Sequence, residues 1–256
     1  MKRFTYLLII TTLGILSVSS CKNVIKNDGV DQSVATDTIP AETEPMFMYV
    51  TAVSGLTLRD QPDLQSEKLA IMPLGTKVKL QTHNSESTMN IGGIDGAMDE
   101  VEFNDKKGFV FNGFISKYTP SGTNAVAENY FEDLKKDFPE VEYSEVTGGT
   151  VSKPSKTQTT LLPTDKWHEG FFMAQQLYGI PRQFAFPNPT GSNNEIQKNS
   201  NKNKNDLISE LQISRRNNTL QKIVYFNQSQ KLESTVTITK EGNKIKIEKV
   251  ETVNQP

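Results

Sequence analysis

The first hydrophobic segment of the chain is a continuous apolar run. Residues 4–16 are mostly apolar, follow Lys2 and Arg3, and precede the small residues 17–20. A membrane-spanning helix needs roughly 20 apolar residues, so this run of 13 residues is too short to be a permanent anchor. The layout is typical of a secretory signal peptide, and residues 1–20 are therefore predicted to be a leader.

From Met46 to residue 119 the pattern changes to short stretches in which apolar and polar residues alternate. Leu56 and Leu58 form one such pair, and Val78 and Leu80 form another. This period of two predicts strands, and the sequences DQPD and PLG between them are typical of turns. Five such strands in about 70 residues predict a small all-β, SH3-like antiparallel barrel, which leaves few unpaired strand edges.

A helical period follows the predicted barrel. Ala127, Phe131, Leu134 and Phe138 fall on one face of a helix over residues 123–138, which Pro139 ends. Residues 147–164 show no clear period. We therefore predict a helix and linker over residues 120–154.

The last part of the chain combines a helix with alternating segments. The stretch 164–181 places Trp167, Phe171, Ala174 and Tyr178 on one face. A short strand is predicted at 182–191, an Asn- and Lys-rich loop at 192–206, and a final hairpin around Glu241-Gly242-Asn243. This pattern predicts an α+β domain over residues 155–256, with one helix on an antiparallel meander of three to five strands.

The single cysteine lies directly behind the leader. Val18-Ser19-Ser20-Cys21 resembles a bacterial lipobox. The resemblance implies that Cys21 carries a diacylglycerol, becomes the new N-terminus and receives further acyl chains such as palmitate, which together anchor a protein stably. The alternative is an ordinary signal peptide with a chance cysteine. The polar, aperiodic residues 21–45 are then a flexible tether.

Residues 55–115 resemble a bacterial SH3 (SH3b) domain. The family has a Gly-Leu-x-aliphatic-Arg strand, a Pro-containing turn, a Gly-Thr-x-Val segment and a closing Gly-aromatic-Val strand. The matching positions are Gly55, Leu56, Leu58, Arg59, Pro62, Gly75, Thr76, Val78, Gly108, Phe109, Val110, Phe114 and Ile115. A frequent tryptophan is absent and the loop 82–99 is long. Both departures lie where a ligand would be recognised, so the usual ligand specificity of the family is not assigned to this chain.

Candidate ligand residues follow from this resemblance. Exposed aromatic side chains suit a groove between barrel loops, and Tyr49 and Phe111 are the candidates, although either can equally belong to the core. We predict that Arg59 pairs with Asp60 or Asp63 rather than with a ligand.

Charge and chemistry exclude several other functions. Without Lys2 and Arg3, the 28 basic residues become 26 against 30 acidic ones, a net charge of −4. No basic field attracts nucleic acid. The two histidines, His83 and His168, have no metal-site motif, and His168 is predicted to be a surface residue. Cys21 would be acylated, so it cannot serve a Cys–His hydrolase. We predict no enzyme activity, no cofactor and no metal.

The function predicted from sequence is that of a lipid-anchored protein of the bacterial cell envelope. Its SH3b domain would bind peptidoglycan peptides without catalysis, as the resemblance implies. The alternative is a surface-exposed interaction protein whose C-terminal domain binds a protein partner or host factor. Lys22 is not the aspartate that retains lipoproteins at the inner membrane, which favours the outer membrane where two membranes are present.

Overall fold

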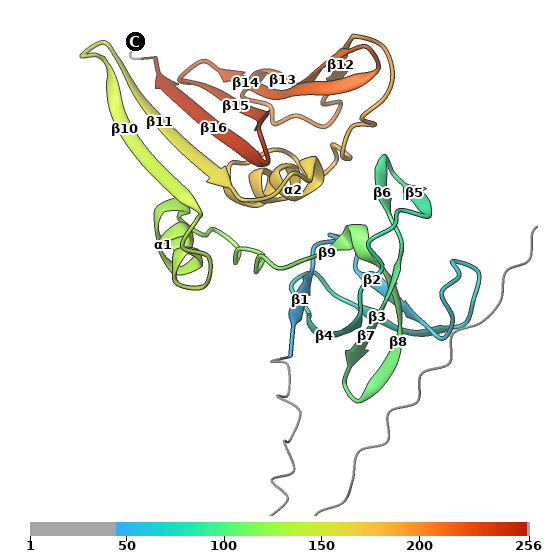
Figure 1. The fold of residues 1–256 in the computed structure, drawn as a ribbon. Helices are drawn as coiled ribbons and strands as arrows, with labels where there is room; N and C mark the ends of the chain where they lie inside the picture. The colour runs from blue at the N-terminus through green and yellow to red at the C-terminus, as the bar shows by residue number, and fades with distance from the viewer. Residues whose placement is uncertain (1–44, 255–256) are drawn as a thin grey trace, which may run out of the picture. The chain divides into compact units, whose positions relative to one another are not determined.

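The computed structural model describes residues 45–254, so Cys21, the predicted leader and nearly all of the tether lie outside it. In these residues 50% of the positions lie in strands and 12% in helices. The strands form sheets of seven, two and seven members, accompanied by two α-helices. The predicted fold class, a small barrel followed by an α+β domain, is therefore wrong, because this part of the chain is mostly β (Figure 1).

The first sheet has seven antiparallel strands in the order β3-β2-β8-β7-β4-β1-β9. Its core contains the alternating apolar residues, among them Leu58, Val78 and Val101. The strands are β1 (Phe47–Val50), β2 (Leu56–Arg59), β3 (Lys68–Met72), β4 (Lys77–Thr82), β7 (Met98–Phe103), β8 (Lys106–Phe111) and β9 (Ile115–Ser116).

Two of the predicted strands are each divided by a turn, which raises the number from five to seven. Gly55, at a φ of 88°, lies in the turn between β1 and β2, a backbone conformation that glycine adopts without steric cost. The 3₁₀ turn η1 (Asn112–Phe114) separates β8 from β9. The long loop 82–99 also contains a separate hairpin of β5 (Met89–Ile91) and β6 (Ile94–Gly96).

The third sheet runs in the order β10-β11-β16-β15-β14-β13-β12, again antiparallel throughout. The predicted hairpin around Gly242 is confirmed, with Glu241 paired to Lys244. The strands are β10 (Glu142–Thr150), β11 (Lys153–Leu162), β12 (Asn194–Lys198), β13 (Asp206–Arg216), β14 (Thr219–Ser229), β15 (Leu232–Glu241) and β16 (Lys244–Val253).

Three sequence interpretations of this region are corrected. Residues 147–162 are not a linker, because most of them belong to the β10–β11 hairpin. The loop 192–206 contains strand β12, and the stretch 182–191 forms no strand. Polar residues occupy these strands, and backbone pairing with neighbouring strands rather than an apolar face holds β10 and β12 in place.

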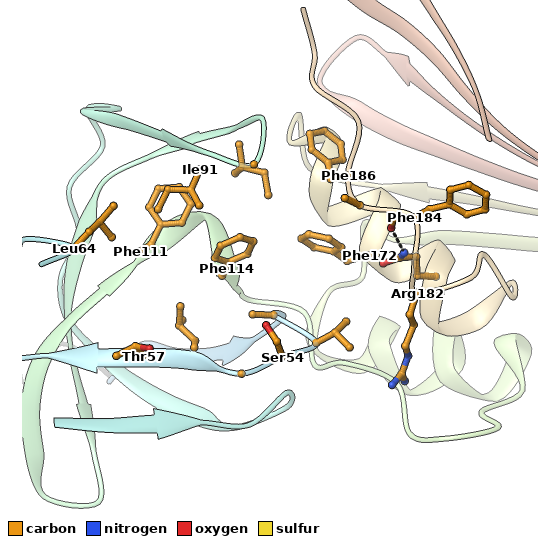
Figure 2. A pocket seen from close by; sticks show the side chains of 18 of the residues that line it. Ser54, Thr57, Leu64, Ile91, Phe111, Phe114, Phe172, Arg182, Phe184 and Phe186 are labelled. Carbon is orange, nitrogen blue, oxygen red and sulfur yellow. Dashed lines mark hydrogen bonds between the residues drawn. The ribbon is translucent and has the colours of Figure 1, made fainter. Parts of the chain in front are cut away.

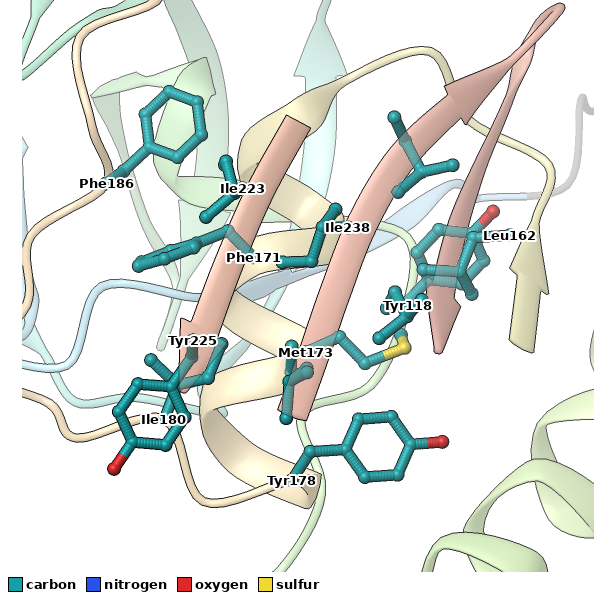
Figure 3. Packing of buried hydrophobic residues seen from close by; sticks show 14 of the residues in the cluster. Tyr118, Leu162, Phe171, Met173, Tyr178, Ile180, Phe186, Ile223, Tyr225 and Ile238 are labelled. Atoms are coloured by element: carbon teal, nitrogen blue, oxygen red, sulfur yellow. The ribbon is translucent and has the colours of Figure 1, made fainter. Parts of the chain in front are cut away.

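The two predicted helices are confirmed as α1 (Ala127–Asp137) and α2 (Trp167–Leu177). Helix α2 packs on the third sheet, with Phe171 close to Ile223 and Ile238 in the buried cluster (Figure 3). A β-carbon added at Gly170 would lie 2.5 Å from Ile245 Cγ2, so the glycine permits a close approach of helix and sheet. In the part of the chain that the structure covers, neither helix has the length and apolarity needed to cross a membrane.

Candidate ligand pocket

The first sheet and α2 border an apolar pocket of about 570 Å³ (Figure 2). Its wall is formed by the turn before β2, the β5–β6 hairpin, η1, one side of α2 and the segment 182–186. The described residues belong to one compact unit. One buried cluster contains Ile94 and Phe111 from the first half of the chain together with Phe171 from α2. The pocket therefore lies beside a core that both halves share.

Five phenylalanines line this pocket: Phe111, Phe114, Phe172, Phe184 and Phe186. Phe111 and Phe114 meet edge to face with their ring centroids 5.4 Å apart. Phe114 lies 6.4 Å from Phe172 of α2, measured between centroids. Both distances fall within the range in which aromatic pairs attract each other.

The position of Phe111 depends on two glycines that flank its ring. A β-carbon at Gly96 would come within 2.8 Å of the ring, and one at Gly113 within 2.4 Å. Asn112 fixes the turn between Phe111 and Phe114, because its Oδ1 accepts from Ala97 N at 2.9 Å and its Nδ2 donates to Asp99 Oδ1 at 2.9 Å.

The opposite wall is held by Gln175 of α2. Its Nε2 donates to the carbonyl oxygen of Phe184 at 2.8 Å and to that of Pro181 at 3.3 Å. The side chain of Gln175 is buried, and these bonds satisfy its amide group where water is excluded. The segment that carries Phe184 and Phe186 is therefore fixed to α2.

Helix α2 is also bonded to strand β9 of the first sheet and to the loop that follows it. Ser116 Oγ donates to Glu169 Oε1 at 2.9 Å, and both side chains are buried. Ser121 N donates to Gln176 Oε1 at 2.8 Å. These bonds hold α2, which carries Phe172 and Gln175 of the pocket wall, in a fixed position.

Two arginines are the charged residues of the pocket wall, Arg59 and Arg182. The predicted ion pair of Arg59 with Asp60 or Asp63 is not formed, because its Nη1 donates instead to the carbonyl oxygen of Ser66 at 2.8 Å. Among residues 45–254 no carboxylate forms a salt bridge with either arginine. Figure 2 shows the Arg182 guanidinium pointing away from the phenylalanine rings, so the pocket itself is apolar.

The structure separates the two groove residues expected from sequence. Phe111 lines the pocket and is also part of the buried core. Tyr49 is half-buried on β1 and is not part of the pocket wall. Sequence reasoning did not single out Phe172, Phe184 or Phe186, although Phe172 directly follows Phe171 of the apolar stripe of α2 and therefore lies beside that stripe.

His168 is buried, which corrects its prediction as a surface residue. It packs against Phe172 and Phe186, and its Nε2 has no hydrogen-bond partner in the part of the chain that the structure covers. Burial, assisted by the nearby Lys166, lowers the pKa of His168 to about 4, while Asp165 acts in the opposite direction. His168 is therefore neutral at pH 7.

The other histidine takes part in a polar cluster away from the pocket. His83 Nδ1 lies 2.7 Å from Asp99 Oδ2, and Asp99 is buried. Asp99 also accepts from Asn84 N at 2.9 Å, which secures the start of the long loop. No group of three or more His, Cys, Asp or Glu side chains positioned for a metal ion occurs among residues 45–254.

Comparisons of the chain with protein-family models, with curated proteins and with solved structures give no match in any of the three searches. The functional argument therefore depends on the sequence motifs and on the geometry of the pocket.

Proposed function

We propose that this chain is a lipid-anchored protein of the bacterial cell envelope that binds an apolar ligand without catalysis. The observation that carries the ligand part of the proposal is the pocket of about 570 Å³ lined by five phenylalanines. Sites for small ligands commonly have volumes of about 300–1,000 Å³ and mainly apolar and aromatic walls. The anchor part depends on the resemblance of residues 18–21 to a lipobox.

The rigidity of the pocket wall supports a role for the pocket in ligand binding, rather than its being a gap left by imperfect packing of the core. Gln175 fixes one wall and Asn112 fixes the other through hydrogen bonds. A wall that is ordered before the ligand arrives costs less conformational entropy on binding. The pocket is also open to solvent at Ser54 and Ala185, which are exposed and line it.

A cell-wall peptide is the second candidate ligand, and the SH3b resemblance of residues 55–115 favours it. Phe111 lies both within this stretch and in the pocket wall. In this version of the proposal an apolar side chain of the peptide would enter the same pocket. The two candidates differ in whether the protein associates with intact peptidoglycan.

The pocket is tested with the uncharged dye N-phenyl-1-naphthylamine, whose emission rises in apolar surroundings. We expect saturable binding to the chain without its lipid, residues 22–256. Ser54→Trp and Ala185→Trp would fill the pocket from exposed positions and weaken dye binding at least about tenfold, or ~1.4 kcal/mol. Ser152→Trp adds the same ring at an exposed hairpin turn outside the pocket and is the control.

Two results contradict the proposal of an apolar site: no dye binding, or equal binding by all three variants and the unaltered chain. Co-sedimentation with purified peptidoglycan sacculi then separates the ligands. Pelleting that Ser54→Trp abolishes identifies a wall peptide as the ligand. The anchor is tested separately by feeding labelled palmitate to cells, where Cys21→Ser should prevent labelling and release the protein from membranes.

A further inference from the structure

A second cavity, of about 600 Å³, lies on the third sheet and has the opposite chemistry from the phenylalanine pocket. It is bounded by the C-terminal turn of α2, the loop 199–206 and strands β13–β16. Amide and hydroxyl side chains dominate its lining, among them Gln183, Asn199, Asn203, Asn227 and Ser234. Figure 3 shows Tyr178 and Tyr225, which also line the cavity, at the end of the buried cluster.

The polar groups beneath this cavity are connected in one chain of hydrogen bonds. Gln183 Nε2 donates to Asn199 Oδ1 at 2.8 Å, and Asn199 Nδ2 donates to Ser209 Oγ at 3.1 Å. Ser209 Oγ in turn lies 3.1 Å from the Tyr225 hydroxyl. Asn199, Ser209 and Tyr225 are all buried, so their side chains are held in fixed positions rather than moving freely in solvent.

This network is more polar than the fold requires. Replacing both partners of a buried hydrogen bond by apolar groups of similar shape is often nearly neutral for stability. The same sheet uses Ile and Val at many of its buried positions, for example Ile213, Ile223 and Val236, although it also buries Gln158, Thr160 and Arg215. What distinguishes this cavity is that eight of its 15 lining residues carry an amide or hydroxyl group and several of them are held by the network, which indicates a polar ligand.

The charges at the cavity disfavour an anionic ligand. Lys249 Nζ lies 2.8 Å from Glu251 Oε1, so these two opposite charges compensate each other. Asp206 is the other carboxylate of the lining. The amide groups of Asn and Gln both donate and accept hydrogen bonds, and this dual capacity matches the hydroxyl and acetamido groups of sugars.

We propose that the cavity between the C-terminal turn of α2 and the loop 199–206 is a binding site for a neutral saccharide. The site is separate from the phenylalanine pocket and does not depend on the function proposed for it. Asn203 of the loop and Asn227 of β14 contact the sugar, and Asn227 does so with its Oδ1 because its Nδ2 donates to the Ile208 carbonyl oxygen at 3.2 Å. The Gln183–Asn199–Ser209–Tyr225 network, which is buried from Asn199 onward, keeps the floor in position.

The probe is tri-N-acetylchitotriose, a neutral oligosaccharide, titrated into residues 22–256 and followed by calorimetry. We expect saturable binding that is insensitive to salt. Asn203→Ala and Asn227→Ala should each weaken it about fivefold or more, because each removes hydrogen bonds to the sugar. Asn205→Ala is the matched control, since Asn205 lies in the same exposed loop but outside the lining.

Thermal unfolding of every variant shows whether it is folded. Asn203→Ala should leave the loop intact, because the backbone carbonyl of Asn203, and not its side chain, accepts the hydrogen bond from Asp206 N. Ser54→Trp should leave sugar binding unchanged, which separates this site from the phenylalanine pocket. The proposal is overturned if no heat is observed at roughly 10 mM trisaccharide, where even a 1 mM site is largely filled. Equal affinity of Asn203→Ala, Asn227→Ala and Asn205→Ala would overturn it as well.

Discussion

At the scale of single residues, Phe111 shows how one side chain serves both stability and the pocket. Its ring is 3% exposed and belongs to the buried cluster, yet one edge contributes to the pocket wall. Gly96 and Gly113 leave the space that the ring occupies. The glycines are needed here for packing and not for an unusual backbone angle, since neither has a positive φ.

Gly113→Ala tests this packing. A new methyl group would lie 2.4 Å from Phe111 Cε1 and 2.6 Å from Ile94 Cγ2, so the ring or the turn must shift. We expect the free energy of unfolding to fall by about 1–3 kcal/mol, and dye affinity at the pocket to fall with it. Gly122→Ala meets no atom within 4 Å and should change the stability by less than ~0.5 kcal/mol. Equal stability of the two variants in urea unfolding would contradict this account.

His168 gives the molecule a pH-dependent stability. Burial lowers its folded-state pKa to about 4, from an ordinary value of 6.5. Between these values the unfolded chain binds a proton that the folded chain does not, so the stabilisation is complete above pH 6.5 and is lost as the pH falls toward 4. The loss attributable to this residue is on the order of 3 kcal/mol.

The measurement is urea unfolding of the unaltered chain and of His168→Leu at pH 7 and pH 4.5. Carboxylates titrate in both proteins, so the difference between them isolates the histidine. We expect the variant to lose less stability on acidification. Parallel losses in the two proteins would show that the imidazole does not remain neutral when folded.

At the scale of secondary structure, helix α2 connects the two candidate sites. One side carries Phe172 and Gln175 to the phenylalanine pocket, while its C-terminal turn carries Tyr178 to the polar cavity. The helix lies close to the sheet because position 170 has no side chain. The geometry of both sites therefore depends on how α2 sits on β15 and β16.

Gly170→Ala is expected to disturb both sites together. Alanine favours a helix by roughly 1 kcal/mol over glycine, but its methyl group would lie 2.5 Å from Ile245 Cγ2, a stiff β-branched side chain. We expect overpacking to prevail and the free energy of unfolding to fall by about 1–3 kcal/mol. Gly148→Ala, with its nearest contact at 3.5 Å, is the control for added bulk. A stabilised Gly170→Ala protein would show that helix propensity prevails instead.

At the scale of the whole described chain, the first sheet has a core of its own around Leu58 and Val78 and also shares a second buried cluster with the third sheet. Ile94 and Phe111 belong to the same cluster as Phe171 and Ile238. The buried Ser116–Glu169 hydrogen bond adds a polar connection. A shared core predicts that the two sheets unfold together.

Denaturant unfolding followed by Trp167 fluorescence and by far-UV circular dichroism tests this cooperativity. Trp167 is the only tryptophan and lies on α2, while the dichroism reports both sheets. We expect the two signals to give coincident transitions. Ser116→Ala should lower the free energy of unfolding by about 1–3 kcal/mol, because the buried side chain of Glu169 loses its hydrogen-bond donor. Ser152→Ala, at an exposed turn, is the control. Two separate transitions would indicate two independent cores.

The sequence by itself determined the elements whose pattern is local. The helical period of three to four residues located α1 and α2, the period of two located the strands with a buried apolar face, and turn residues located the hairpin at Gly242. Strands β10 and β12 were missed because an edge strand without a buried face has no hydrophobic period, and the central strand β11 was missed because it buries Gln158 and Thr160 rather than apolar residues before Leu162. Their pairing is decided by backbone hydrogen bonds to neighbouring strands.

Only the tertiary structure decided which side chains form sites. Phe111 and Phe172 are 61 positions apart in the sequence, and no local pattern indicates that they line one pocket. Tyr49, which has the same aromatic character as Phe111, lies outside it. Composition and spacing identify the residue types that suit a ligand. Whether such residues come together in one site depends on long-range packing, because the contacts that bring distant segments together are not encoded in any single segment.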